Sequence, residues 1–71
     1  MSQLPPLVDP ADVIPSLKLR GKTKRSKYER GMRLLGNVGV LRKVGGRWKV
    51  VASKLNRELP DVYDMLCESH A

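Results

Sequence analysis

The chain has 71 residues, which allows one small domain with a thin hydrophobic core built mainly from Val, Leu and Met. It carries a net charge of +7, from 14 Lys and Arg against 7 Asp and Glu, and contains a single cysteine. This composition excludes an intramolecular disulfide, and no apolar run reaches the length that spans a membrane. We therefore expect a cytoplasmic protein without membrane association. Prolines and aspartates interrupt residues 1–17, so no secretory signal peptide is expected there.

The charge is segregated along the chain. All 14 Lys and Arg lie within residues 18–57, where Glu29 is the only acidic residue, whereas residues 1–17 and 58–71 contain acidic residues and no Lys or Arg. A basic block of this kind favours a polyanionic partner, and we expect nucleic acid, with duplex DNA favoured. A nucleoid-associated location would then follow. A solubilising surface is the alternative, although so many like charges repel one another.

Residues 1–17 contain four of the five prolines, which excludes a long helix or a central strand. Asp9 is predicted to cap one helical turn that begins at Pro10 and is stopped by Pro15 after Ile14. The leucines and valines of this segment allow it to dock on its own domain or on a partner, and the sequence leaves both alternatives open.

Residues 18–27 form a basic stretch with no apolar periodicity, which we expect to be extended when free. Arms of this composition lie along phosphates or enter a minor groove, and a plain flexible linker is the alternative. We therefore expect residues 1–25 to form a flexible Pro-rich and basic arm, and residues 26–71 to form a small helical domain.

A first helix is predicted over residues 26–44. Ser26 with Glu29 three residues later matches a capping box at its start. Apolar residues then recur at steps of four and three, as on one buried helix face: Tyr28, Met32, Leu35, Val38 and Leu41. Three glycines within the segment each weaken this prediction.

The same region allows a different structure. The stretch VGVLRKV, the pair Gly45–Gly46 and the stretch RWKVV fit a β-hairpin at about residues 38–51, because two glycines accept positive φ at both turn positions. We favour the helix, since Gly45 and Gly46 also suit a helix C-cap. An α+β fold with this hairpin remains the alternative.

Two further helices are predicted, over residues 47–57 and 60–69. The first of them places apolar residues at positions i, i+3, i+4 and i+7: Trp48, Val51, Ala52 and Leu55. Trp48 is expected in the core. Pro60 suits the first turn of the second, with Asp61 near its N-terminus. Together the three helices predict a mainly α, helix-turn-helix-like domain preceded by the extended basic arm.

One motif resembles a known family. The pattern Gly-x-Trp-x-x-Val/Ile-Ala-x-x-Leu is matched by Gly46, Trp48, Val51, Ala52 and Leu55. Tyr28 and Cys67 lie close to the flanking aromatic positions of that pattern, although Cys67 is not aromatic. Over residues 28–71 the chain is thus similar to a Myb or SANT repeat. The resemblance implies a three-helix domain and, for SANT-like members, binding to other proteins.

The helix over residues 60–69 carries only acidic charges, so it gains nothing from contact with phosphates and is not expected to read DNA. The contacts are expected from the basic residues, mainly to the phosphate backbone: Lys18, Arg20, Lys22, Lys24, Arg25, Lys27, Arg30, Arg33, Arg42, Lys43, Arg47, Lys49, Lys54 and Arg57. The acidic residues of the last helix are expected to face a protein partner or a basic patch on a second copy, as a homodimer would provide: Asp61, Asp64 and Glu68.

Three other motifs do not support a catalytic or metal-binding function. GKT at residues 21–23 lacks the first glycine of a phosphate-binding loop. GNVG at residues 36–39 resembles the GxxG loop by which a KH domain clamps RNA backbone, but it offers no cation and no clear three-stranded sheet is expected around it. Cys67 and His70 have the spacing of metal ligands, but two more ligands would be needed. We expect no enzyme activity and no cofactor. The favoured function is a small DNA-binding regulator; a protein-interaction module acting as an inhibitor or adaptor of transcription or replication is the alternative, and RNA binding is third.

Overall fold

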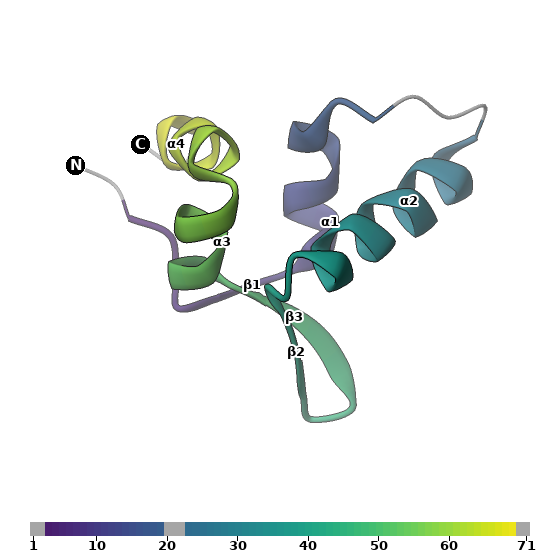
Figure 1. Cartoon of the computed structure of the whole chain (residues 1–71), viewed down its shortest axis with the longest axis horizontal. Helices are drawn as coiled ribbons and strands as arrows, with labels where there is room; N and C mark the ends of the chain where they lie inside the picture. The colour runs from purple at the N-terminus through teal and green to yellow at the C-terminus, as the bar shows by residue number, and fades with distance from the viewer. Residues whose placement is uncertain (1–2, 20–22, 70–71) are drawn as a thin grey trace.

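The computed structural model describes residues 3–19 and 23–69 and is an α+β fold (Figure 1). Its elements in chain order are β1 (Leu7–Val8), α1 (Pro10–Val13), the 3-10 helix η1 (Ile14–Leu17), α2 (Lys24–Asn37), β2 (Leu41–Val44), β3 (Arg47–Val51), α3 (Ala52–Glu58) and α4 (Pro60–Ser69). The prediction of a mainly α domain of three helices is therefore wrong. The described part of the chain holds four α-helices and a three-stranded antiparallel sheet, including the hairpin of the alternative prediction.

The sheet has the strand order β1-β3-β2, and both neighbouring pairs are antiparallel. β2 and β3 form a hairpin in which Lys43 pairs with Trp48. Gly45 and Gly46 form its turn, with φ angles of 58° and 78°. Two-residue hairpin turns need positive φ at both positions, which glycine adopts without a steric penalty. The glycine pair thus turns a hairpin and does not cap a helix.

α2 ends at Asn37, well before the predicted end of the first helix. Gly39 follows the helix with a φ of 76°, in the left-handed region. Its N–H donates to the Gly36 carbonyl, and the Val40 N–H donates to the Leu35 carbonyl, which satisfies two terminal carbonyls of the helix. Leu35 and Val40 are both fully buried in the core. The apolar spacing that continues beyond Gly39 therefore belongs to a strand.

The start of α2 also differs from the prediction. Thr23 is the N-cap, and its hydroxyl oxygen accepts a hydrogen bond of 3.1 Å from the Ser26 N–H. Ser26 lies inside the helix, and Glu29 pairs with Arg25 and does not complete a capping box. The N-cap of α2 is thus Thr23, about one turn before the predicted cap Ser26.

The predicted helix over residues 47–57 is wrong in its first half. Residues 47–51 form β3, and the chain passes directly from this strand into α3 at Ala52. The helix-spaced apolar residues are therefore split between a strand and a helix. Trp48 is 47% exposed, so its assignment to the core is wrong, and Val50 is the buried residue of this strand. The helix over residues 60–69 is confirmed as α4.

The N-terminal segment packs on its own domain. The Asp9 carboxylate accepts a hydrogen bond of 3.0 Å from the Ala11 N–H, which confirms the predicted cap of α1. The helical path continues through Pro15 as η1, beyond the predicted stop. Val8 pairs with β3, and the segment contributes four buried side chains to the core: Leu4, Val8, Val13 and Ile14. Docking on a partner is thus not needed to bury these residues.

Figure 1 shows α1 and η1 in the middle of the molecule, with α2 on one side and α3 and α4 on the other. The core lies between these elements, and each of its members outside the N-terminal segment comes from α2 onward: Leu35, Val40, Val50, Ala52, Leu55 and Leu66. η1 approaches α2 closely at Gly31, where a Cβ would lie 2.6 Å from Cγ1 of the buried Ile14. Because Gly31 has no side chain, α2 can pack this closely on Ile14 of η1.

We expect Gly31→Ala to lower the free energy of unfolding by about 1–3 kcal/mol, because an added methyl overpacks the contact with Ile14. Gly36→Ala is the matched control, since its Cβ would meet only Leu41 Cδ1 at 3.8 Å. That exposed helical position should gain up to about 1 kcal/mol from the better helix propensity of alanine. Urea unfolding followed by circular dichroism measures both, and equal effects of the two changes would contradict the packing.

Candidate nucleic-acid interface

α2 has two faces of different character. Gly31 and Leu35 are buried against the core. Residues spaced three, four and seven apart lie on the opposite face and are exposed, or half-buried in the case of Ser26: Ser26, Glu29, Arg30, Arg33 and Asn37. These side chains are of the kinds that hydrogen-bond phosphates and base edges. The outward face of α2 is therefore polar and carries two arginines.

The hairpin carries four cations and no acidic residue. Arg42 pairs across the strands with Lys49, so these two side chains lie on one face of the hairpin together with Arg47. Lys43 and Trp48 pair on the other face, and the Lys43 Nζ lies 5.9 Å from the centroid of the Trp48 ring, within the range of a cation–π contact. Both faces of the hairpin are thus positively charged.

A cavity of about 280 Å³ separates the hairpin from α2. Tyr28 and Met32 of α2 line it on one side, and residues 46–49 of the hairpin line it on the other. Tyr28 is 43% exposed and Trp48 is 47% exposed, so the two aromatic residues of the cavity are both open to solvent. We call this cavity the aromatic groove.

Asp9, which also lines the aromatic groove, lies next to a cation. Its Oδ2 is 3.8 Å from the Lys49 Nζ. The second ion pair joins Arg25 Nε and Glu29 Oε1 at 3.3 Å along α2, and both of its side chains are well exposed. Exposed pairs of this kind contribute little to stability, so they leave these side chains able to exchange partners.

The structure groups most of the predicted contact residues. Four lie on α2 and four on the hairpin: Arg25, Lys27, Arg30, Arg33, Arg42, Lys43, Arg47 and Lys49. Lys54 and Arg57 lie apart, on α3, and Lys18 is exposed at the end of η1. Arg20 and Lys22 lie outside the described residues, as does the side chain of Lys24.

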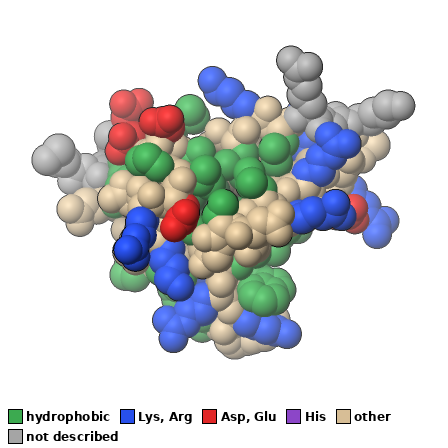
Figure 2. Space-filling model, viewed as in Figure 1, with side chains coloured by type: hydrophobic (Ala, Val, Ile, Leu, Met, Phe, Trp, Pro, Cys, Tyr) green, Lys and Arg blue, Asp and Glu red, His purple; other side chains and the backbone are tan. Residues whose placement is uncertain are grey.

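The view in Figure 2 shows Lys and Arg side chains around the hairpin and along α2, and acidic side chains gathered over α4 at the upper left. Asp61, Asp64 and Glu68 are exposed on α4. The structure thus has a basic side and an acidic end. This separation is visible in the sequence only as blocks of charge.

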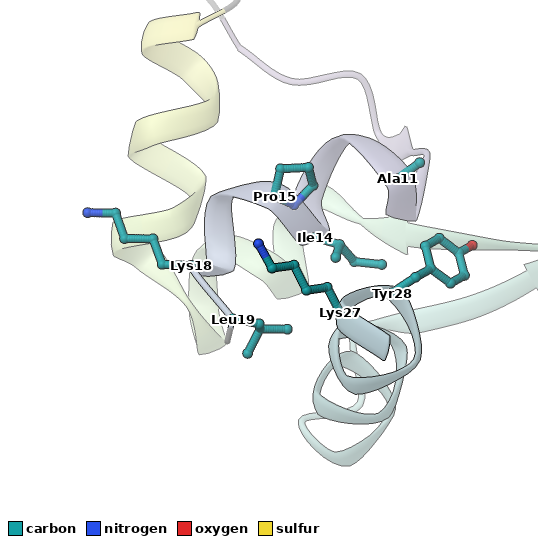
Figure 3. Close-up of a pocket in the computed structure, with 7 residues that line it drawn as sticks. All are labelled: Ala11, Ile14, Pro15, Lys18, Leu19, Lys27 and Tyr28. Carbon is teal, nitrogen blue, oxygen red and sulfur yellow. The ribbon is translucent and has the colours of Figure 1, made fainter. Parts of the chain in front are cut away.

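A second cavity, of about 360 Å³, lies where η1 meets α2 (Figure 3). Ile14, Pro15 and Leu19 give it an apolar lining, and Lys27 extends over it from α2. Residues 20–22, which join its two sides, lie outside the described part of the chain. We assign no ligand to this cavity.

The C-terminal helix shows one polar contact of interest. A hydrogen bond with the Cys67 side chain, together with burial, raises the pKa of the Tyr63 hydroxyl above its ordinary value.

Residues 3–19 and 23–69 contain no group of three or more His, Cys, Asp or Glu arranged to hold a metal ion. His70, the other member of the Cys67–His70 pair, lies outside the described residues.

Four residues of the candidate interface are not predicted from the sequence. The helical spacing predicts buried positions for Tyr28 and Trp48, and no sequence pattern marks Glu29 or Asn37 as a contact. One signal is present for Trp48, because the order Arg47-Trp48-Lys49 places cations on both sides of an aromatic residue in a segment that also fits a strand. Glu29 and Asn37 become recognisable only once the ends and the buried face of α2 are known.

Comparison of the chain with known families, curated proteins and solved structures finds no relative. No family model matches the chain, and neither a curated protein nor a solved structure does. The residues that resemble a Myb or SANT motif lie in a hairpin and a short helix, so the three-helix arrangement which that resemblance implies is not the one observed. None of the helices that the structure describes is long and apolar enough to cross a membrane.

We expect Trp48→Ala to lower the free energy of unfolding by much less than Leu55→Ala, because Trp48 is half exposed and Leu55 is fully buried. Leu55→Ala should lower it by about 2–5 kcal/mol, enough to abolish cooperative unfolding in so small a domain. Thermal and urea unfolding followed by circular dichroism measure both. Acrylamide should quench Trp48 in the folded protein, and a protected tryptophan would contradict the exposed position.

Proposed function

We propose that this protein is a small DNA-binding regulatory protein, with α2 placed in the major groove of duplex DNA and the hairpin against the neighbouring backbone. The observation that carries the proposal is the basic side of the molecule, where α2 and the hairpin together present eight cations, with Glu29 as the one acidic residue on those two elements among the residues described. The major groove admits an α-helix or a two-stranded ribbon, so both elements have suitable dimensions. The proposal assigns no catalytic residue and no cofactor.

The order of the elements supports the same orientation. η1 and α2 are consecutive helical elements that pack on each other. In a helix-turn-helix the second helix enters the major groove and the first crosses the backbone. The pair that fits this description is α1–η1 with α2, and not the pair at residues 47–57 and 60–69 favoured from the sequence.

The residue types on α2 extend the expected contacts from phosphates to bases. Arg hydrogen-bonds guanine, Asn hydrogen-bonds adenine and Glu accepts from cytosine in the major groove. Arg33, Asn37 and Glu29 lie on the exposed face of α2. The cations of the hairpin lie beside this face and are suited to phosphates. Backbone contacts would supply most of the affinity and α2 a limited sequence preference.

The charge distribution also sets which side meets DNA. The acidic residues of α4 lie at the end of the molecule away from the hairpin and α2 (Figure 2). A polyanion attracts the basic side and repels the acidic end, so long-range electrostatics orient the protein before contact. An approach through α4 would bring like charges together.

Fluorescence anisotropy with labelled duplex DNA, single-stranded DNA and duplex RNA, each over a salt series, tests the class of partner. We expect duplex DNA to bind most tightly, with log affinity falling against log salt at a slope of about −0.9 per phosphate neutralised. Tighter binding to duplex RNA than to duplex DNA would favour RNA binding as the function. No binding to any of the three near physiological salt would overturn the proposal.

A matched pair of double variants tests the orientation. Arg30→Ala with Arg33→Ala removes two cations from α2, and Lys54→Ala with Arg57→Ala removes the same charge from α3. We expect the α2 variant to bind duplex DNA at least about tenfold more weakly, with the salt slope reduced by about 1 for each phosphate that is no longer neutralised. The α3 variant should be weakened less. Equal weakening of the two would show that net charge alone determines binding.

The exposed acidic side of α4 favours a second candidate function, a protein-interaction module. Replacing Asp61 and Asp64 by Asn and Glu68 by Gln removes three charges without changing side-chain size. If α4 binds a partner, affinity capture should recover that partner with the wild type and the Arg30→Ala, Arg33→Ala variant, and lose it with the α4 variant. Unchanged DNA affinity of the α4 variant would show that the two surfaces act separately, whereas weakened affinity would argue against the proposed orientation.

A further inference from the structure

We infer that the aromatic groove between α2 and the hairpin binds a single unpaired nucleobase turned out of a duplex. The protein would then prefer DNA that contains a bulged or unpaired nucleotide over the same duplex fully paired. This inference rests on the proposed binding of duplex DNA and names the form of DNA that the same site takes.

The first observation is the position of Trp48. The chain has three aromatic residues, and a thin core would be expected to use the largest of them, yet Trp48 is 47% exposed and the core is completed by aliphatic side chains. Trp48 shares its strand face with the buried Val50 and with Lys43, whose Nζ lies 5.9 Å from the ring centroid. An exposed indole beside a cation is the kind of platform on which a base stacks.

The second observation is which other side chains line the groove. Tyr28 and Met32 of α2 line the same cavity, and Tyr28 is 43% exposed. The groove therefore presents aromatic and apolar surface from two elements, which suits the face of a base and not a bare phosphate. Its volume of about 280 Å³ is close to the lower limit of small-molecule sites, as a single base requires.

The third observation is the charge at the groove. Arg47 and Lys49 also line it, from the strand face opposite to Trp48, and they can hold the phosphates that flank a stacked base. Asp9, the acidic residue in the lining, has its Oδ2 3.8 Å from the Lys49 Nζ. The local charge therefore stays positive. A groove that combines cations with aromatic residues has the general features of a site for unpaired nucleotides.

The place of the groove on the molecule gives the base a route into it. With α2 in the major groove and the hairpin against the adjacent backbone, the space between them faces the sugar-phosphate chain that separates the two DNA grooves. A base rotated out of the stack emerges along this chain. Opening costs least where the base has no partner, so a bulged nucleotide enters more readily than a paired one.

Two duplexes of one sequence, one fully paired and one with a single extra thymidine in one strand, test the inference by anisotropy and by the fluorescence of Trp48. We expect the bulged duplex to bind at least about fivefold more tightly, the lower end of the range for one stacked base. Because Trp48 is the only tryptophan, quenching of its emission reports stacking directly. Quenching should be strong with the bulged duplex and weak with the paired one.

Three variants identify the residues responsible. Trp48→Leu and Tyr28→Leu keep apolar bulk but remove the stacking surface, so each should abolish most of the preference for the bulged duplex while retaining affinity for the paired one. Trp48→Phe should keep much of the preference. Val44→Ala, which changes an exposed apolar residue on the hairpin outside the groove lining, is the control and should leave the preference unchanged. Circular dichroism verifies that each variant is folded.

The outcomes separate this inference from the proposed function. Equal affinity and equal quenching with both duplexes would overturn the inference and leave the binding of duplex DNA standing. A Trp48→Leu variant that is folded but binds both duplexes equally weakly would assign Trp48 to the support of the hairpin and would also overturn the inference. No binding to the paired duplex, with quenching by the bulged one, would overturn the proposed major-groove contact and retain the groove.

Discussion

The end of α2 is the constraint on which the rest of the structure depends. Gly39 adopts a φ that other residues reach only with strain, and this lets the N–H groups of residues 39 and 40 bond back to the last turn of the helix. The same reversal buries Val40 with Leu35 in the core. It also directs the chain into β2, so that the hairpin lies beside α2. Without this turn, the apolar spacing would continue as helix and no groove would exist between the two elements.

Because the core is small, most residues lie at the surface, where they can carry charged side chains. Ten buried hydrophobic residues come from nearly every element of the chain, including the N-terminal segment, and none of the described buried residues is polar or charged. Each element contributes one face inward and keeps the other for solvent. α2 shows this division most clearly, because its inner face carries a glycine at the closest contact with η1 and its outer face carries cations. Stability and binding are thus assigned to different faces of the same helices.

Features determined by local interactions could be predicted from the sequence. The Asp9 cap of α1 and the bounds of α4 are correct, because both depend on residues adjacent in the chain. The helix over residues 47–57 is wrong because the spacing from Trp48 to Leu55 fits a helix by coincidence, with a strand ending at Val51 and a helix starting at Ala52. What the sequence could not supply is the pairing of β1 with β3, which joins segments more than 40 residues apart in the chain. The cations of the candidate site were identifiable from composition, but the placing of Tyr28 and Trp48 in one cavity follows from the packing of α2 against the hairpin.

The direct passage from β3 into α3 gives the molecule a mechanical property. No loop separates Val51 from Ala52, and two backbone bonds fix this junction to other parts of the chain: the Val51 N–H donates to the Val40 carbonyl at 2.9 Å and the Ala52 N–H to the Pro6 carbonyl at 3.0 Å. A displacement of the hairpin therefore cannot be absorbed by a flexible linker and is passed to α3 and then to α4, which packs on it. The hairpin and the acidic helix α4 are thus connected through α3 by short links that are hydrogen-bonded at the sheet.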